Sequence, residues 1–305
     1  MSELTCAPIL VTGAGGGVGG VGGLIVRFLR EQGLPVRAMV HHDDDRAAPL
    51  RALGAEVVAG DLTQPGDVAR VLDGSRRVYF GMSVSAEYLE AAATVASVAS
   101  TVADLEVLVS ISQMTVSQMT AVSTEESRHQ RLHFLAEQVL DWSGLPVVQV
   151  RPTMFLENPL LTMVTARSVA EEGLLRLPFG AGRTSPVGAI DVARVVAAIL
   201  AVPVPHVGRT YELTGPRSLD MTSVAEEFSN GLGRPVTYVD VPFDAWAKEI
   251  ATIGLPPHVE QHLVTMARLH GQNRYDRVTD TVEAITGTPA QTIAEFVASH
   301  AGLFS

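Results

Sequence analysis

The segment that decides the fold is residues 9–30, which read ILVTGAGGGVGGVGGLIVRFLR. A short apolar run leads into a cluster in which eight of the eleven residues 13–23 are glycine, and apolar residues at helical spacing follow. Such a strand-to-helix turn lets the backbone approach a pyrophosphate closely, and the free N–H groups and dipole of the helix N-terminus favour the anion. The segment predicts a dinucleotide-binding βα unit. A flexible glycine linker is the alternative, but linkers are not flanked by a strand and an amphipathic helix.

The same alternation continues along the first half of the chain. Apolar runs predict further strands at 35–40, 56–59, 78–80, 105–110 and 147–150, and helical patterns lie between them at 47–53, 65–72, 88–103 and 124–143. Gly33 suits the C′ position that ends the first helix. Strictly alternating strands and helices predict an α/β fold, a doubly wound parallel sheet covered on both faces.

The pattern changes after Arg151-Pro152. Helices are expected at 159–172, 191–201, 222–231, 243–253 and 257–270, short strands near 210–214 and 236–241, and a last helix after Pro289 that ends near His300. We therefore expect a Rossmann domain over residues 1–155 and a smaller, mainly helical substrate region over 156–305. Residues 187–214 could return to the first domain.

Composition limits the classes of partner. The formal net charge is −11, which argues against direct binding to nucleic acid or to an anionic membrane. There is a single cysteine, Cys6, no basic and apolar leader, and no apolar stretch of about 18 residues, so a soluble cytoplasmic protein is expected. A small-molecule substrate is the expected partner. The oligomeric state stays open, a homodimer included.

One common catalytic apparatus is missing. Short-chain dehydrogenases use a Tyr-x-x-x-Lys pair on the helix after the fifth strand, where the lysine lowers the tyrosine pKa. No tyrosine lies between residues 89 and 210, and Lys248 is the one lysine of the chain. The usual carbonyl mechanism is thereby excluded, and an epimerase or dehydratase of nucleotide sugars is disfavoured.

Several segments together resemble a known family. They are residues 11–19 of the glycine loop, Gly60-Asp61-Leu62, the stretch from Leu145-Pro146 through residues 151–158, and the tail Thr286-Gly287-Thr288-Pro289 with Phe296 and His300. They resemble the NmrA-like branch of the atypical short-chain dehydrogenases/reductases over essentially the whole chain. The resemblance implies NAD(P) on a Rossmann sheet, with substrate held between the sheet and the C-terminal region.

The resemblance also implies which residues meet the cofactor. They are Thr12, Gly13, Gly16, Gly17, Val18, Gly19, His41, Asp61, Leu62, Gly81, Met82, Ser83, Pro152, Thr153 and Phe155. Two glycine registers fit, Gly13/Gly16/Gly19 and Gly16/Gly19/Gly22, and the chain departs from the family by a few residues inserted before Gly33.

The end of the second strand normally distinguishes NAD from NADP, through an acid for the ribose or a base for the 2′-phosphate. Here it carries His41 and Arg46 but also three aspartates, Asp43 to Asp45. The basic residues favour NADP, the aspartates oppose a phosphate, and a solvated turn would explain most of these charges.

The candidate catalytic residues are His133 and Ser112. His129, His133 and Glu137 share one helix face, and His133 matches the place where several relatives carry a lysine. A histidine there could donate a proton, although a helix histidine bonded to a neighbouring loop is the structural alternative. The His129/His133 spacing lacks the glutamate of a zinc helix, so no metal is expected.

A methionine-bearing loop follows the fifth strand, at the edge of the sheet where such folds bind ligands. Gln113, Met114, Met119 and the later Asn158 are the expected pocket residues, with packing of Met114 or Met119 in the core as the alternative. The sequence favours an NAD(P)H-dependent reductase of a conjugated or aromatic acceptor such as a quinone, an azo compound or a polyketide-like compound. A non-catalytic NAD(P) redox sensor of the NmrA type is the alternative.

Overall fold

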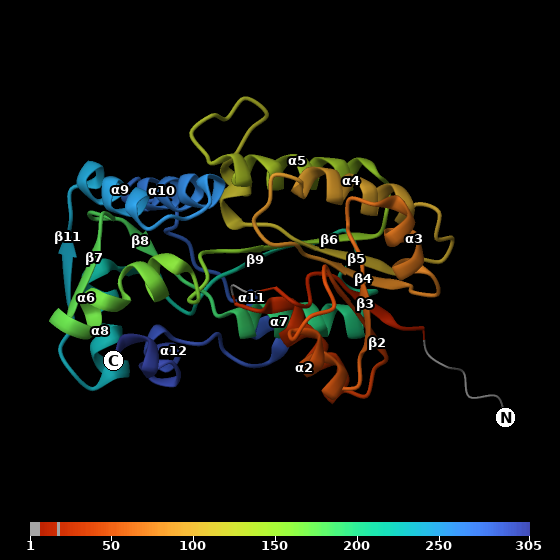
Figure 1. The fold of residues 1–305 in the computed structure, drawn as a ribbon, viewed down its shortest axis with the longest axis horizontal. Coiled ribbons are helices and arrows are strands. Elements are labelled where there is room, and N and C mark those ends of the chain that lie inside the picture. Colours follow the sequence, from red (N-terminus) through yellow and green to blue (C-terminus); the bar gives the residue numbers. More distant parts are fainter. Residues whose placement is uncertain (1–6, 17–18) are drawn as a thin grey trace. The chain divides into compact units, whose positions relative to one another are not determined.

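The computed structural model describes residues 7–16 and 19–305, and Figure 1 shows its ribbon. The chain forms two compact units, and each is described by itself. Unit 1 contains the chain up to residue 112 together with residues 132–151 and 192–211, and unit 2 contains residues 113–131, 152–191 and 212–305. In the part of the chain that the structure describes, no helix has the length and apolar character needed to cross a membrane.

The central element is a seven-stranded sheet in the order β3-β2-β1-β4-β5-β6-β9. The strands are β1 (Ile9–Val11), β2 (Val36–Val40), β3 (Glu56–Ala59), β4 (Arg77–Phe80), β5 (Val107–Ile111), β6 (Val147–Pro152) and β9 (Thr210–Leu213). The pairs from β3 through β6 are parallel. The strand order reverses between β1 and β4, which is the switch point where open α/β sheets bind ligands.

The last strand is parallel as well. Gly208 N donates to Val147 O at 2.8 Å, and Gln149 N donates to Arg209 O at 3.0 Å. These bonds advance in the same direction along β6 and β9, as a parallel ladder requires. The predicted doubly wound parallel sheet is therefore confirmed.

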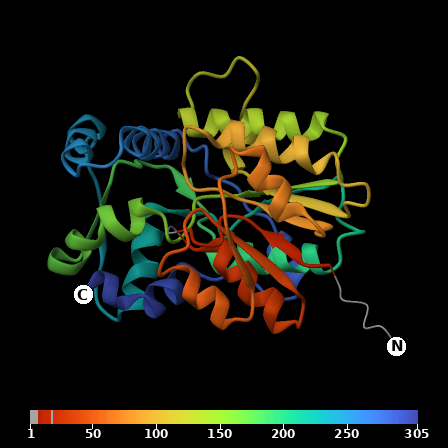
Figure 2. The same cartoon turned by 45° about the vertical axis from the view of Figure 1, so that its right-hand side comes forward.

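Helices cover both faces of the sheet in unit 1. Those that contribute residues to this unit are α1 (Val21–Glu31), α2 (Ala47–Ala52), α3 (Pro65–Leu72), α4 (Tyr88–Ala99), α5 (Arg128–Trp142) and α7 (Ala189–Ala201). One apolar core joins Val68 of α3, Val95 of α4 and Leu140 of α5 to the buried strands. Figures 1 and 2 show α3, α4 and α5 on one side of the sheet and α2 and α7 on the other.

The first helix ends as its sequence predicts. Gly33 has φ +74°, a conformation that costs glycine little. Its N–H donates to Arg30 O at 2.9 Å, and Leu34 N donates to Leu29 O at 3.0 Å. These two bonds form a Schellman motif with Gly33 at C′.

Unit 2 mixes helices with two small sheets. Strands β7 (Leu174–Leu177) and β11 (Thr237–Asp240) pair in parallel, and β8 (Arg183–Thr184) pairs antiparallel with β10 (Leu219–Asp220). The helices that lie entirely in this unit are α6 (Ala166–Glu172), α8 (Met221–Leu232), α9 (Phe243–Thr252), α10 (Pro257–Gly271), α11 (Thr281–Thr286) and α12 (Ile293–Ser299). Strands β7, β8 and β10 and helix α11 were not anticipated, because segments this short carry little periodicity.

One helix boundary differs from the prediction in an informative way. Helix α5 begins at Arg128, four residues later than the apolar pattern suggests. Ser127 N donates to Gln130 Oε1 at 2.8 Å, and Gln130 N donates to Ser127 Oγ at 3.1 Å. This capping box ends the loop that precedes the helix.

Candidate functional site

Glycines enforce a narrow turn after β1 in unit 1. Gly13 has φ +62°, and a Cβ atom there would lie 2.5 Å from Gly81 O. A Cβ atom on Gly22 would lie 2.7 Å from Gly13 O, so only glycine lets α1 pack this closely on the turn. Each of the two glycine registers contributes one of these positions. Gly17 and Val18 lie outside the described residues.

The N-terminus of α1 suits an anion. Gly20 is the N-cap with φ +58°, and the described residues place no capping side chain and no acidic residue in the first turn. The first helical bond runs from Leu24 N to Gly20 O at 3.0 Å, so the N–H groups of residues 21–23 have no acceptor within the helix. Free N–H groups and the helix dipole at a glycine turn fit a pyrophosphate.

The loops after β1 and β4 are joined at the switch point. Thr12 Oγ1 donates to Gly81 O at 2.9 Å and accepts from Gly81 N at 3.0 Å. A Cβ atom on Gly16 would lie 4.0 Å from Ser83 Oγ, and Ser83 is exposed. The structure thus brings together Thr12, Gly13, Gly16, Gly81 and Ser83, five of the residues expected to meet the cofactor.

The turn after β3 presents Asp61 and Leu62. Backbone and hydroxyl hydrogen bonds from Thr63, both 2.8 Å, lower the pKa of Asp61, and the nearby His41 lowers it further. His41 is exposed and its ring lies 4.0 Å from that of His42, measured between centroids. His41 and Asp61 therefore lie near one another in unit 1.

The acidic residues after β2 are largely paired with arginines. Arg46 contacts Asp44 at 2.5 Å and its Nη1 donates to Gly15 O at 3.3 Å, while Arg51 contacts Asp43 at 2.6 Å. Hydrogen bonds from Arg46 lower the pKa of Asp44 to about 2. Arg46 is thus held beside the glycine loop.

Ser112 lies just beyond the end of β5. Its N–H donates to Val150 O at 2.7 Å, which continues the parallel ladder. Its side chain is buried, and Oγ has no hydrogen-bond partner among the described residues. A buried hydroxyl without a partner is costly, so this atom is suited to bind a ligand at the carboxyl edge of the sheet.

His133 is buried on α5, and its ring lies 4.0 Å from that of Tyr88 between centroids. The Tyr88 hydroxyl donates to Ile111 O at 2.7 Å. His133 is thereby linked through Tyr88 to the end of β5, next to Ser112. Its helix neighbour Glu137 is buried and accepts from Arg151 Nε at 3.0 Å.

Tyr88 was missed by the sequence analysis, which considered only tyrosines at the position of the usual catalytic pair. Burial raises the pKa of its hydroxyl well above the ordinary range. The hydroxyl therefore stays neutral and donates to Ile111 O. The pairing of Tyr88 with His133 has no local signal, since it joins two helices distant in sequence.

The residues expected to line the substrate pocket lie in unit 2 and differ in burial. Met114 lies in the apolar core of this unit, so it takes the alternative that the sequence left open. Met119 is also buried, whereas Gln113 is partly exposed. Asn158 uses its side chain locally: Oδ1 accepts from Leu160 N at 2.9 Å and Nδ2 lies 3.7 Å from Met266 Sδ.

The last residue of β6 and the residues that follow it differ in burial. Pro152 and Thr153 are buried, and Phe155 is partly exposed and forms an isolated bridge with Val187. Thr153 Oγ1 has no hydrogen-bond partner among the described residues. It is a second buried hydroxyl that could bind a ligand.

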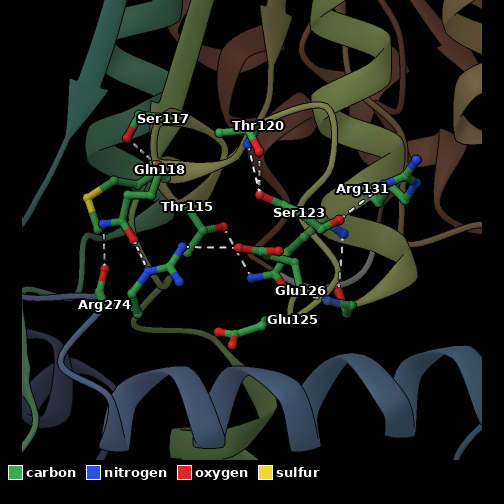
Figure 3. Close-up of polar contacts among 12 residues, drawn as sticks. Thr115, Ser117, Gln118, Thr120, Ser123, Glu125, Glu126, Arg131 and Arg274 are labelled. Atoms are coloured by element: carbon green, nitrogen blue, oxygen red, sulfur yellow. Dashed lines mark hydrogen bonds and ion pairs between the residues drawn. The ribbon is translucent and has the colours of Figure 1, made fainter.

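Arginines near the end of α10 clasp the loop formed by residues 113–127, which we call the β5 loop. Arg274 Nη2 donates to Glu126 Oε1 at 3.1 Å, and its Nε donates to Gln118 Oε1. Gln118 Nε2 returns a bond to Arg274 O at 2.9 Å (Figure 3). Arg277 Nη1 donates to Ser117 Oγ at 3.0 Å. These side-chain contacts add to the backbone turns within the β5 loop, such as the bond from Val116 N to Gln113 O at 3.1 Å.

Residues 6–297 match the NmrA-like family. The chain belongs to the NmrA-like family. This membership confirms the resemblance stated from the glycine loop, the Gly-Asp-Leu turn and the segment after β6.

Two reductases are similar to this NmrA-like chain in sequence over nearly their whole length. It is 30% identical over 292 residues to an NAD(P)H azoreductase of Xenophilus azovorans, which covers 95% of this chain and 97% of the relative. It is also 30% identical to the (4-alkanoyl-5-oxo-2,5-dihydrofuran-3-yl)methyl phosphate reductase of Streptomyces griseus, covering 97% of this chain and 99% of that one.

Solved structures share the NmrA-like fold. The NADPH-dependent quinone oxidoreductase of Escherichia coli, solved with NADPH, superposes with a TM-score of 0.82 at 22% identity. The match covers 97% of this chain and all of the other. At this identity the likeness concerns the fold, and it agrees with the parallel sheet and the helices described above.

Proposed function

We propose that this chain is an NAD(P)H-dependent oxidoreductase that reduces a conjugated or aromatic acceptor, such as a quinone, an azo compound or a polyketide-like compound. The observation that carries the proposal is the turn between β1 and α1, where Gly13 and Gly22 leave room for backbone only. It lies at the switch point of a doubly wound sheet, where dinucleotides bind. Two relatives at 30% identity over nearly their whole length are reductases by name, and one of them is an azoreductase.

The residues of unit 1 fit a dinucleotide. The N–H groups at the start of α1 would hold the pyrophosphate, and the Asp61-Leu62 turn would meet the adenine. Arg46 and His41 would face a 2′-phosphate, which favours NADP(H) because Asp43 and Asp44 are already paired with arginines. When bound, the nicotinamide supplies a hydride.

Loss of the Tyr-x-x-x-Lys pair is compatible with this chemistry. A conjugated acceptor spreads the negative charge that it gains, so reduction depends on orientation and a water-poor site more than on a strong acid. The hydroxyl of Ser112, which has no hydrogen-bond partner among the described residues, would donate to the acceptor. His133, packed on Tyr88, would supply the proton.

The decisive experiment is steady-state oxidation of NADPH and of NADH against a panel of quinones, azo dyes and triphenylmethane dyes. Ser112→Ala and His133→Gln should each lower kcat/KM about tenfold or more, since a single positioned donor or acid contributes that much. Ser75→Ala is the matched control: Ser75 also has a buried hydroxyl without a partner among the described residues, but it precedes β4 at the opposite edge of the sheet.

The alternative is a redox sensor that binds the cofactor without turnover. Tight NADPH binding by calorimetry with no oxidation by any acceptor would favour the sensor. Turnover that is equal in the Ser112→Ala and Ser75→Ala variants would remove Ser112 from the mechanism while leaving the reductase assignment intact.

A further inference from the structure

His41 follows β2 directly and lies between the glycine loop and the turn after β3, all within unit 1. On one side Gly60 N donates to Val40 O at 3.0 Å, which brings the turn after β3 beside the end of β2. On the other side Ala14 N donates to Met39 O at 3.2 Å, which holds the glycine loop against β2. This is the position where a Rossmann sheet recognises either a free ribose or a ribose 2′-phosphate.

The arginines near this position are already bound to carboxylates. Arg46 Nε and Nη2 both donate to Asp44, at 3.0 and 2.5 Å, and Nη1 donates to Gly15 O at 3.3 Å. Arg51 donates to Asp43 at 2.6 Å. Each of these pairs carries no net charge. Arg46 would have to leave Asp44 to give a phosphate its full charge, so arginine alone distinguishes the two cofactors poorly here.

Two histidines can supply a positive charge that no carboxylate has already paired in this way. His41 and His42 are exposed, their ring centroids lie 4.0 Å apart, and neither ring has a hydrogen-bond partner among the described residues. Histidine is the side chain that gains or loses its charge between about pH 5 and pH 8. Two rings this close take up one proton more readily than two, and a phosphate dianion beside them favours the protonated form.

Carboxylates on both sides of the histidine pair make this proton necessary. Asp61, which accepts two hydrogen bonds from Thr63, interacts electrostatically with His41, and Asp44 does so with His42. These carboxylates favour a protonated histidine but would repel a phosphate if both rings were neutral. The glycine loop, residues 13–23, contributes no titratable side chain. The other charged residues of the surrounding turns and helices are Asp43, Asp45, Arg46, Arg51, Asp67 and Arg70.

We infer that His41 recognises the 2′-phosphate of NADP(H) in its protonated form, so that the choice between NADP(H) and NAD(H) depends on pH. The inference rests on the proposed function and specifies how the cofactor is selected within it. Binding of NADP(H) then draws a proton from solvent onto the histidine pair, whereas NAD(H), which lacks this phosphate, draws none. The preference for NADP(H) consequently falls as the pH rises through the range in which histidine loses its charge.

Isothermal titration calorimetry with NADP⁺ and NAD⁺ tests the inference without any acceptor. A phosphate monoester loses its second proton near pH 6, so the 2′-phosphate is mainly a dianion from pH 6.5 to pH 8.5. The ratio of the Kd for NAD⁺ to the Kd for NADP⁺ should fall about fivefold to tenfold over this range, because one charge-assisted hydrogen bond is lost. Titrations in two buffers that differ in ionisation enthalpy should show uptake of up to about one proton with NADP⁺ and none with NAD⁺.

Two variants of His41 separate its charge from its shape. His41→Gln should weaken NADP⁺ binding about fivefold to tenfold at pH 6.5, leave NAD⁺ binding within about twofold of wild type, and remove the pH dependence of the ratio. His41→Arg, whose charge does not titrate in this range, should give the same ratio at pH 6.5 and pH 8.5. His258→Gln, at an exposed position of α10, is the matched control and should keep the wild-type ratio at each pH.

The outcomes distinguish the inference from the proposed function. A wild-type ratio that is equal at pH 6.5 and pH 8.5 would overturn the inference, since a permanent cation such as Arg46 would then recognise the phosphate. A pH dependence that persists in His41→Gln would overturn it as well. A wild-type chain that binds neither NADP⁺ nor NAD⁺ would instead refute the proposed function itself, and the inference with it.

Discussion

The loops that follow β1 and β5 are held in opposite ways. The loop after β1 depends on missing side chains: Gly13 and Gly22 are sites where a Cβ atom would meet backbone within 3 Å. The β5 loop depends on side chains that are present, among them Gln118, Glu126 and their partner Arg274. The first loop therefore offers backbone N–H groups to any anion of the right shape. The second is held by side-chain contacts that single substitutions can remove one at a time.

The difference teaches which substitutions each loop tolerates. The loop after β1 should be disrupted when a side-chain atom is added at Gly13 or Gly22. The β5 loop should instead be destabilised when a side chain such as Arg274 is removed. Three substitution experiments can break or sharpen this contrast.

The largest effect is expected from Gly13→Ala. The new Cβ atom would lie 2.5 Å from Gly81 O, and φ at this position is +62°. We expect a loss of about 3 kcal/mol in stability from strain and clash, and at least a hundredfold weaker NADPH binding by calorimetry. Gly66→Ala is the matched control, since a Cβ atom there has nothing within 4 Å, and the added methyl should stabilise helix α3 by about 0.5–1 kcal/mol.

A smaller effect is expected when the clasp is opened by Arg274→Met. The substitution removes the ion-pair partner of Glu126, whose side chain is almost fully buried, and breaking such a pair costs about 3 kcal/mol. Urea unfolding followed by the fluorescence of Trp246, which is buried in unit 2, gives the value. Arg167→Met, which breaks the exposed Arg167–Glu171 pair, should cost less than about 0.5 kcal/mol. Equal losses in the two variants would show that the clasp does not stabilise unit 2.

The last effect concerns pH and the end of the β5 loop, and at neutral pH it is the smallest of the three because it grows only as the pH falls. Burial lowers the pKa of His262 to about 3 and that of its neighbour His129 to about 4. The folded chain keeps these rings neutral while the unfolded chain protonates them, so their contribution to stability is complete above about pH 6.5 and is lost as the pH falls toward 4. Each histidine should remove about 1.4 kcal/mol per pH unit in this range.

His262→Asn tests this expectation, because asparagine does not titrate. We would measure the free energy of unfolding of this variant in urea from pH 7 to pH 4. It should fall less steeply than that of wild type, by about 1.4 kcal/mol per pH unit, because one fewer group takes up a proton on unfolding. His42→Asn, at an exposed position, is the matched control. An unchanged slope for His262→Asn would mean that the ring is already charged in the folded chain.

The parts of the molecule that could be predicted from sequence are those with a local cause. The glycine cluster, the alternating apolar runs and Gly33 fixed the order of strands and helices because each signal lies within about 20 residues. The start of α5 was also readable: Ser127 and Gln130 have the spacing of a capping box, although the apolar pattern alone placed the helix four residues too early.

The remainder depends on contacts between distant residues. Arg274 meets Glu126 across 148 positions and Tyr88 meets His133 across two helices, and no local pattern marks either pair. The core position of Met114 was likewise left open, because an apolar loop residue can pack inward or face a ligand with the same neighbours in sequence.

The double hydrogen bond between Thr12 and Gly81 has a consequence for the switch point before anything binds. One hydroxyl joins the ends of β1 and β4, donating at 2.9 Å and accepting at 3.0 Å. The gap between these ends is thus set in advance, and a nucleotide that enters need not reshape it. Such preorganisation reduces the entropy lost on association, so that more of the contact energy is expressed as affinity.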